Sequence, residues 1–161
     1  MTLDVRGVPP SELESVLGRI VALNHTIFEG MFPWEPYSLE HYRKRLTGVM
    51  PVVFVAEQDN EIIGDSIAYK YEDPNNHSHY IWILGVQEQY RKKGIATMFL
   101  DFNEQFARKF DCDSVIVKSY NISKDMQRLL LKRNYDIIAV DRNENPKYKG
   151  VHFELDLSPE E

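Results

Sequence analysis

A short basic stretch followed by small residues is the part of this sequence best suited to bind a phosphate group. Arg91, Lys92 and Lys93 are consecutive, and Gly94 and Ala96 follow them at the start of a predicted helix. The first turn of a helix has N–H groups without intrahelical partners and carries partial positive charge. Small residues there let a bulky anion approach the backbone. The pattern predicts a phosphate or pyrophosphate cradle; the alternative is a helix start whose cations are only solvated.

Other reactive side chains point to no metal or nucleophile. Cys112 is the only cysteine, which excludes an internal disulfide, and it lies between Asp111 and Asp113, whose charges disfavour a thiolate. His77 and His79 alternate on a predicted strand, so their side chains point to opposite faces and joint metal ligation is not expected. The sequence also lacks a glycine-rich dinucleotide motif, a Gly-Lys-Ser/Thr phosphate loop and a His-Glu-x-x-His motif.

The composition is that of a soluble globular protein. The 161 residues, 43% apolar and 27% charged, predict a single domain spanning residues 1–161. The net charge of −6 disfavours nucleic acid as a partner, because phosphate backbones select basic surfaces. No apolar run is long enough for a membrane span, and no signal segment opens the chain, so we expect a cytoplasmic protein without a membrane partner.

Hydrophobic periodicity predicts eleven elements that position the basic stretch. They are a strand (3–8), a helix after the N-cap Ser11, a helix between Ser38 and Gly48, strands at 52–56, 61–71 and 79–86, a helix with Ile95, Met98, Phe99, Phe102 and Phe106 inward, a strand at 115–117, a helix around residues 126–130, and strands at 135–141 and 151–157. Asp59-Asn60 indicates a hairpin turn. Three meander strands followed by two helical crossovers predict an α/β (α+β) fold with a mixed sheet and about four flanking helices.

The basic stretch resembles the acetyl-coenzyme A signature of the GNAT-type N-acetyltransferase superfamily. The family pattern Gln/Arg-x-x-Gly-x-Gly/Ala is matched by Arg91, Gly94 and Ala96, and the preceding Leu84-Gly85-Val86 and Tyr90 also match. The predicted order of elements agrees with the family fold over nearly the whole chain. Asn121, the helix after it and Tyr135 resemble the family's second cofactor-side motif.

This resemblance implies a mixed, mostly antiparallel sheet that splays between the strands at 79–86 and 114–120, with acetyl-coenzyme A as co-substrate in the split. The backbone amides of residues 91–96 would hold the pyrophosphate, and backbone near Val86 would face the thioester carbonyl as an oxyanion-type donor. The expected cofactor-binding residues are Leu84, Gly85, Val86, Arg91, Lys92, Lys93, Gly94, Ile95, Ala96, Thr97 and Asn121. Donor and acceptor would react directly, held side by side.

The base that activates an acceptor amine is less apparent. A lysine-like amine needs about 4.6 kcal/mol to reach its neutral form at pH 7, so a base, a water chain or desolvation must remove the proton. Many relatives place a carboxylate on the motif strand, but the corresponding face here has Tyr80, Trp82 and Leu84. Glu29 and Asp65 are the predicted catalytic residues, and Glu35 is a further candidate. The plainer alternatives are loop carboxylates for the two glutamates and an edge-facing or hydrogen-bonded core group for Asp65.

The general acid of the family also lacks a counterpart. Leu130 occupies the position at which many relatives have a tyrosine, counting back from Tyr135. We therefore keep two hypotheses: transfer of an acetyl group to a primary amine of a small molecule or peptide, and a non-catalytic acyl-coenzyme A-binding sensor or interaction module. The aromatic residues Phe28, Phe32, Trp34 and Tyr37 either line the acceptor site or plug the sheet. Family members are often dimers, so a homodimer is also open.

Overall fold

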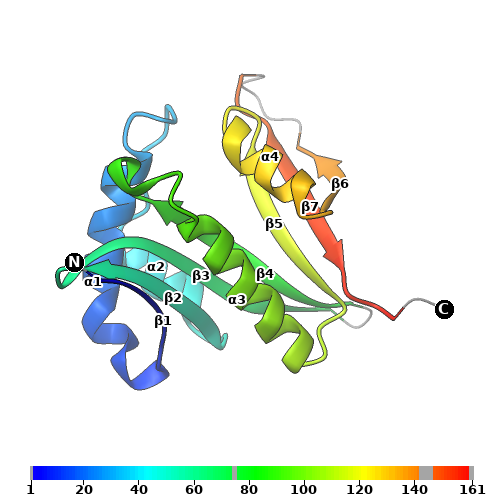
Figure 1. Cartoon of the computed structure of the whole chain (residues 1–161), viewed down its shortest axis with the longest axis horizontal. Coiled ribbons are helices and arrows are strands. Elements are labelled where there is room, and N and C mark those ends of the chain that lie inside the picture. The colour runs from blue at the N-terminus through cyan, green and yellow to red at the C-terminus, as the bar shows by residue number, and fades with distance from the viewer. Residues whose placement is uncertain (1, 74–75, 142–146, 160–161) are drawn as a thin grey trace. The chain divides into compact units, whose positions relative to one another are not determined.

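A computed structural model describes residues 2–73, 76–141 and 147–159, and Figure 1 traces the chain. The elements follow the predicted order, with one added 3₁₀ helix, η1. They are β1 (Leu3–Val8), α1 (Pro10–Phe28), α2 (Leu39–Leu46), β2 (Pro51–Gln58), β3 (Glu61–Asp73), β4 (Asn76–Val86), η1 (Glu88–Tyr90), α3 (Ile95–Lys109), β5 (Ser114–Tyr120), α4 (Lys124–Lys132), β6 (Asp136–Val140) and β7 (Gly150–Asp156).

The sheet has seven strands in the order β1-β2-β3-β4-β5-β7-β6. The pairs β1–β2, β2–β3, β5–β7 and β6–β7 are antiparallel, whereas β4 and β5 are parallel from Ser78↔Ser114 to Ile81↔Val117. A parallel pair needs a crossover connection, and α3 provides it. The predicted mixed, mostly antiparallel sheet with four α-helices is confirmed for the described residues; the splay remains a prediction.

The chain divides into two compact units. The first contains Met1–Tyr69 and Ile83–Asp101, and the second contains Lys70–Trp82 and Phe102–Glu161. The basic stretch, α1 and α2 belong to the first unit; β5, β6, β7 and α4 belong to the second. The expectation of a single domain over residues 1–161 remains a prediction.

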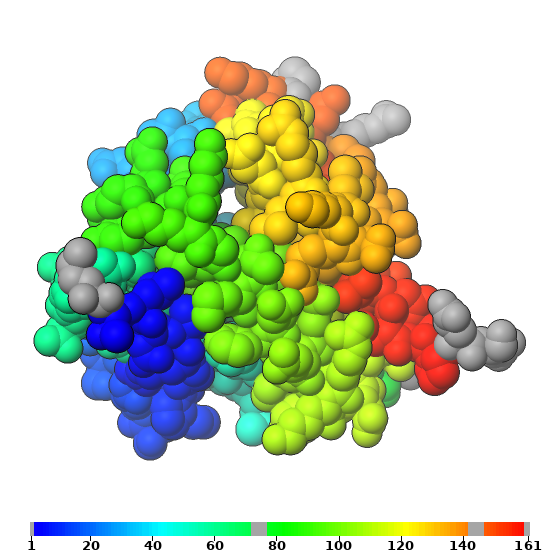
Figure 2. Space-filling model, viewed as in Figure 1, coloured from blue at the N-terminus to red at the C-terminus, as the bar shows by residue number. Residues whose placement is uncertain are grey.

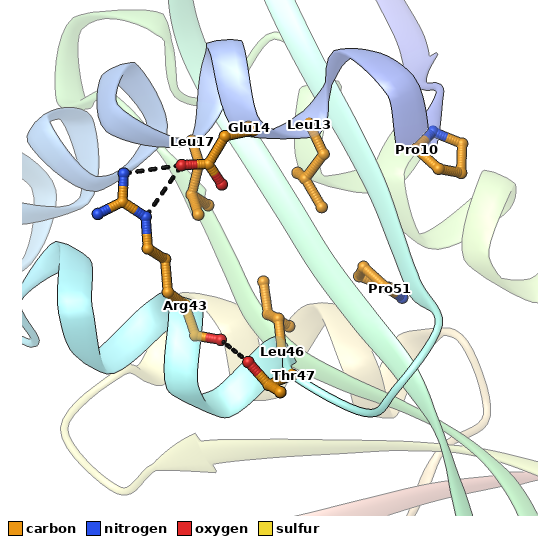
Figure 3. Close-up of a pocket in the computed structure, with 8 residues that line it drawn as sticks. All are labelled: Pro10, Leu13, Glu14, Leu17, Arg43, Leu46, Thr47 and Pro51. Atoms are coloured by element: carbon orange, nitrogen blue, oxygen red, sulfur yellow. Dashed lines mark hydrogen bonds and ion pairs between the residues drawn. The ribbon is translucent and has the colours of Figure 1, made fainter.

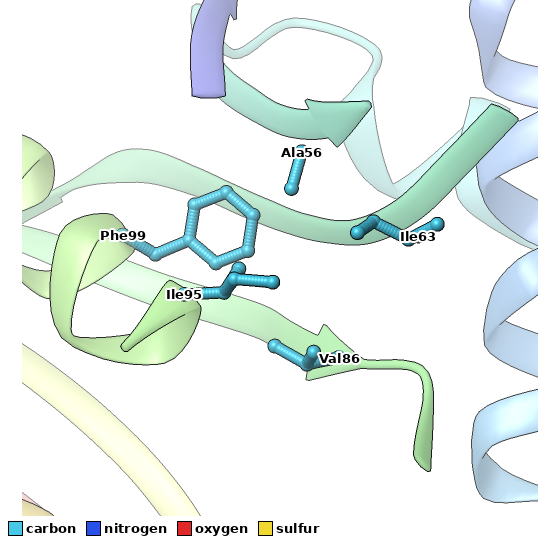
Figure 4. Packing of buried hydrophobic residues seen from close by; sticks show 5 residues of the cluster. All are labelled: Ala56, Ile63, Val86, Ile95 and Phe99. Carbon is cyan, nitrogen blue, oxygen red and sulfur yellow. The ribbon is translucent and has the colours of Figure 1, made fainter. Parts of the chain in front are cut away.

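In the first unit, helices cover both faces of the strands. A Cβ added at Gly64 of β3 would lie 3.2 Å from the Phe99 ring of α3, whereas the next residue, Asp65, bonds to Asn24 of α1. Because successive strand residues face opposite sides, α3 covers one face and α1 the other. Figure 4 shows the buried cluster in which Phe99 and Ile95 of α3 pack near Val86 of β4; Ala56 and Ile63 complete it.

The local signals for helix ends and turns were largely correct. The Ser38 hydroxyl accepts a hydrogen bond from the His41 N–H at 3.1 Å, as an N-cap should, and Gly48 ends α2 with a φ of 81°. Asp59 and Asn60 turn the β2–β3 hairpin with φ angles of 53° and 65°. The predicted Ser11 N-cap was wrong: α1 already begins at Pro10, because proline fits the first helical position, where no N–H is needed.

In the second unit, the predicted strand at 135–141 is shorter than expected. Tyr135 is buried ahead of the strand, while every residue of β6 is exposed at the edge of the sheet.

Two side chains of α3 differ from or add to the expectation. Met98, in the first unit, is exposed, so its predicted inward orientation was wrong. In the second unit, the carboxylate of Glu104 on α3 accepts a 2.6 Å bond from Arg133 after α4. This largely buried ion pair joins the two helices.

Candidate functional site

The loop between β4 and α3 is held in shape by two backbone anchors. The Gln87 N–H donates to the Ile63 carbonyl at 2.8 Å, and the Arg91 side chain donates through Nε to the Val86 carbonyl at 2.9 Å. Lys92 and Gly94 have φ angles of 63° and 82°, so the chain turns sharply before the helix. Residues 91–94 are exposed, and Figure 2 shows this loop, in green, at the molecular surface.

The first turn of α3, at the end of this loop, presents N–H donors that have no helical partner among the described residues. The Gly94 carbonyl accepts the first helical bond, from the Met98 N–H at 3.0 Å, which leaves the N–H groups of Ile95, Ala96 and Thr97 ahead of the helical ladder. The Ile95 side chain is buried in the Phe99 cluster and anchors the turn. A Cβ at Gly94 would meet nothing within 4 Å, so the approach to this backbone is open.

The side-chain charges at the start of α3 suit an anionic ligand. Arg91, Lys92 and Lys93 are exposed beside the positive end of α3, and the Lys93 ammonium lies 5.5 Å from the Tyr90 ring centroid. Together with the open N–H groups, they make a cationic surface that suits a diphosphate. Of the predicted residues, those at 91–97 are thus contiguous around one helix start, and Leu84 packs against the cluster beneath it.

Gly85 brings the end of α1 to the same end of β4. A Cβ at this glycine would lie 3.2 Å from both Ile27 Cδ1 and Phe28 Cζ. The absence of a side chain therefore lets the last turn of α1 pack directly on the strand, next to Val86. Glu29 follows at once as the C-cap of α1, and its side chain is exposed. Sequence reasoning gave no sign of this contact.

The segment at residues 29–38 joins α1 to α2 and carries its aromatic rings near the surface. The Phe32 and Trp34 rings stack with centroids 4.7 Å apart, and Tyr37 stacks on His41 at 4.1 Å. Trp34 and Tyr37 are 41% and 42% exposed. These two rings are therefore surface groups rather than a plug of the sheet. Glu35 is exposed in the same segment.

Asp65 lies in the core and not at the surface. Its side chain is fully buried, and its Oδ2 accepts a 3.1 Å hydrogen bond from Asn24 of α1. Burial raises the pKa of Asp65 to about 8, although the bond from Asn24 acts in the opposite direction. A carboxyl group enclosed in this way cannot reach an acceptor amine directly. The structure therefore supports the core-group alternative and argues against Asp65 as the base.

Asn121 and Leu130, both in the second unit, have structural surroundings. The Asn121 side chain donates to the Lys147 carbonyl at 3.1 Å and accepts from the Lys149 N–H at 2.6 Å, which fixes the chain ahead of β7. Its predicted contact with the cofactor remains a prediction. Leu130 is fully buried in the core. Burial also raises the pKa of the Cys112 thiol, as expected of a structural cysteine.

A pocket of about 380 Å³ lies elsewhere in the first unit, between α1, α2 and the start of β2 (Figure 3). Leu13 and Leu17 face Leu46 across this pocket, and the Glu14–Arg43 ion pair at 2.7 Å closes one side. None of its lining residues belongs to the predicted site. We assign it no role in the chemistry.

Two further features limit the kinds of site present in residues 2–73, 76–141 and 147–159. No helix in these ranges has the length and apolar character that crossing a bilayer demands. Nor do three histidine, cysteine, aspartate or glutamate side chains gather there where they could share a metal ion.

Comparisons with known proteins agree with this geometry. No curated protein matches the sequence. Among solved structures, the NatC complex bound to Gag peptide and CoA contains a similar chain, with a TM-score of 0.80 and 18% identity over 98% of this chain and 100% of that one. The ribosomal-protein-S18-alanine N-acetyltransferase from Escherichia coli gives a TM-score of 0.79 at 12% identity, covering 99% and 97%.

Arabidopsis thaliana NAA60 in complex with acetyl-CoA gives a TM-score of 0.74 at 20% identity, covering 97% and 99% of the two chains. At these identities the likeness establishes the fold. The sequence itself matches the model of the Acetyltransferase (GNAT) family over residues 19–135, a span that includes both the cradle and the segment at 29–38. The chain therefore belongs to the GNAT family of acetyltransferases.

Proposed function

We propose that this acetyltransferase moves the acetyl group of acetyl-coenzyme A directly to a primary amine, with a peptide amine as the first candidate and a small-molecule amine as the second. The observation that carries the proposal is the open start of α3. Free N–H groups, a left-handed Gly94 and three exposed cations lie there together at the end of β4. This arrangement suits the diphosphate of the donor.

The residues at 91–97 would hold that diphosphate, mainly through the main chain. Acetyl-coenzyme A, when bound, supplies an acyl group activated as a thioester. The chain must then bring an amine to the end of β4 and remove its proton. The contact of Phe28 with Gly85 places the start of the segment at 29–38 at this end of the strand.

Glu29 is the carboxylate we propose as the base. It is exposed and directly follows Phe28, which touches β4 at Gly85. A carboxylate there can accept a proton from an ammonium, directly or through one water. Because Leu130 is buried and apolar, we propose that water protonates the departing thiolate. Thiols have pKa values near 8–9, so the leaving group is a tolerable one.

A peptide acceptor is favoured by the surface around Glu29. Exposed Trp34 and Tyr37 offer apolar contact area, and the net charge of −6 favours a cationic amine. Similar folds occur in the NatC complex bound to Gag peptide and in the ribosomal-protein-S18-alanine N-acetyltransferase. The cytoplasmic location and the homodimer remain predictions.

The proposal is tested by coenzyme A release in the presence of an amine panel. We expect release from acetyl-coenzyme A that depends on added peptide or small-molecule amine and gives an N-acetylated product by mass spectrometry. Peptides blocked at the amine are the control and should give no release. Amine-independent release alone, or no product across a broad panel, would contradict transfer to an amine.

The second candidate is a non-catalytic acyl-coenzyme A-binding module. Two observations favour it: residues 76–86 contain no carboxylate, and the position of the family's tyrosine holds the buried Leu130. It predicts a rise in melting temperature with acetyl-coenzyme A, without turnover on any amine. Turnover that depends on Glu29 would exclude it.

A further inference from the structure

Three buried polar side chains connect both N-terminal helices to the sheet of the first unit. Asn24 of α1 and Tyr42 of α2 are 2% exposed, and Asp65 of β3 is 0% exposed. The two N–H bonds of the Asn24 amide are used in two directions, toward the Tyr42 hydroxyl and toward Asp65 Oδ2, both at 3.1 Å. One amide thus joins α1, α2 and β3.

Two acceptor atoms in this cluster lack a donor. Asn24 Oδ1 and Asp65 Oδ1 are both buried without a hydrogen-bond partner among the described residues. If Asp65 were ionised, its Oδ1 atom and the Asn24 Oδ1 atom would both remain without a donor. Each buried acceptor without a donor costs free energy. A single proton on Asp65 Oδ1 can satisfy both, because a protonated carboxyl group is a donor and the amide oxygen is an acceptor. The pair would then be a cyclic acid–amide pair.

The surroundings of Asp65 favour the neutral acid. The titratable group that faces it is Tyr42 from α2, and its strand neighbour on β2 is the fully buried Val55. No ion pair to Asp65 is present among the described residues. Without a cation, burial disfavours the charged form of a carboxyl group. This agrees with the raised pKa of about 8.

The cluster lies next to the residues that hold the segment at 29–38. His25 follows Asn24, and its Nε2 donates to the Tyr37 carbonyl at 2.6 Å. The Glu29 N–H in turn donates to the His25 carbonyl at 2.9 Å. Hydrogen bonds therefore join both ends of the segment at 29–38 to His25 of α1. The preceding residue, Asn24, is hydrogen-bonded to Asp65.

We propose that Asp65 is a positioning residue: as a neutral acid paired with the Asn24 amide, it holds α1 and α2 on β3 so that the segment at 29–38 is ordered for the acceptor. This rests on the proposed function, in which that segment borders the acceptor amine. Loss of the proton on Asp65 leaves both buried acceptors without a donor and loosens the segment. The cradle at 91–97 makes none of these bonds, so donor binding is unaffected.

The protonation state is tested without any activity. Carbon-13 NMR of aspartate carboxyl groups should show one resonance that titrates near pH 8 and is missing in the Asp65→Asn variant. Hydrogen exchange of residues 29–38 should be faster in the wild type than in Asp65→Asn at pH 9 and equal at pH 6.5. Titration of Asp65 near pH 4, or exchange independent of the variant, overturns the proposal.

The positioning role is tested by separating the two Michaelis constants. The Asp65→Asn variant carries an amide N–H donor in place of the acid O–H and cannot ionise at this position, so it should retain the neutral pairing at every pH. At pH 9, one unit above the pKa, about one tenth of the wild type has the neutral acid, so its KM for the acceptor should rise up to about tenfold relative to Asp65→Asn. KM for acetyl-coenzyme A should not change. Comparison at equal pH cancels titration of the amine itself.

Two further variants make the result interpretable. Asp59→Asn is the matched control, because it makes the same chemical change at an exposed turn residue and should behave as the wild type at every pH. Asn24→Ser removes the amide and should raise the acceptor KM already at pH 6.5. Equal changes in both Michaelis constants, or none, overturn the positioning role. If no amine is acetylated, the proposed function fails, and the NMR and exchange results still decide whether Asp65 orders the segment.

Discussion

Replacing Asp65 by asparagine should stabilise the protein increasingly as the pH rises. The carboxyl pKa is 3.8 as a reference value and about 8 in the fold, because burial penalises the charged form. Between these values the unfolded chain releases the proton while the native state retains it, so the wild type loses stability with rising pH. The loss is about 1.4 kcal/mol per pH unit, or about 3 kcal/mol from pH 5 to pH 7. The asparagine side chain of the variant cannot ionise and escapes this loss.

Urea unfolding of the wild type, Asp65→Asn and Asp59→Asn at pH 5, 6, 7, 8 and 9 measures the effect. The free energy of unfolding of Asp65→Asn minus that of the wild type should grow steadily up to about pH 8 and then level off, because both wild-type states are ionised above it. Asp59→Asn, exposed in its turn, should show no such trend. A difference that stays constant across the series would refute the raised pKa and the neutral acid–amide pair.

Three other changes test different parts of the structure. Glu29→Gln should lower kcat about 100-fold with little change in KM for acetyl-coenzyme A, because it removes the proposed base but leaves the cradle intact; an unchanged kcat would exclude Glu29. Glu104→Ala should lower the free energy of unfolding by about 2–4 kcal/mol, because it removes the carboxylate that lies 2.6 Å from the largely buried Arg133 guanidinium. If urea denaturation shows that the free energy of unfolding falls by less than about 0.5 kcal/mol, the ion pair is dispensable. Burial lowers the pKa of His79, so below about pH 6.5 the unfolded chain binds a proton that the native state does not, and the stability of the wild type should fall. The His79→Gln variant should therefore lose less melting temperature than the wild type between pH 7 and pH 5. An equal loss in both proteins would contradict this prediction.

The order of elements could be predicted because the strongest signals are local. The Ser38 cap, the Asp59-Asn60 turn and Gly48 each act within a few residues, and the structure shows all three. The prediction that Met98 faces inward was wrong because helical periodicity cannot distinguish a core position from one at the margin of the apolar face. The start of α1 was displaced because Pro10 serves as the first helical residue.

The cofactor side of the site was more predictable than the acceptor side for the same reason. The cradle is one contiguous stretch, so its residue types and its place before a helix can be read from neighbouring positions. The packing of Phe28 on Gly85 and the burial of Asp65 against Asn24 depend on contacts 57 and 41 positions apart in the chain. A polar residue on a strand face looks the same in sequence whether it faces substrate or a partner in the core.

A crystal structure with saturating acetyl-coenzyme A tests the cradle most directly. We predict that diphosphate oxygens lie within hydrogen-bond distance, about 2.7–3.2 Å, of main-chain N–H groups in residues 92–97. A diphosphate bound elsewhere, with this helix start facing only solvent, would contradict the assignment.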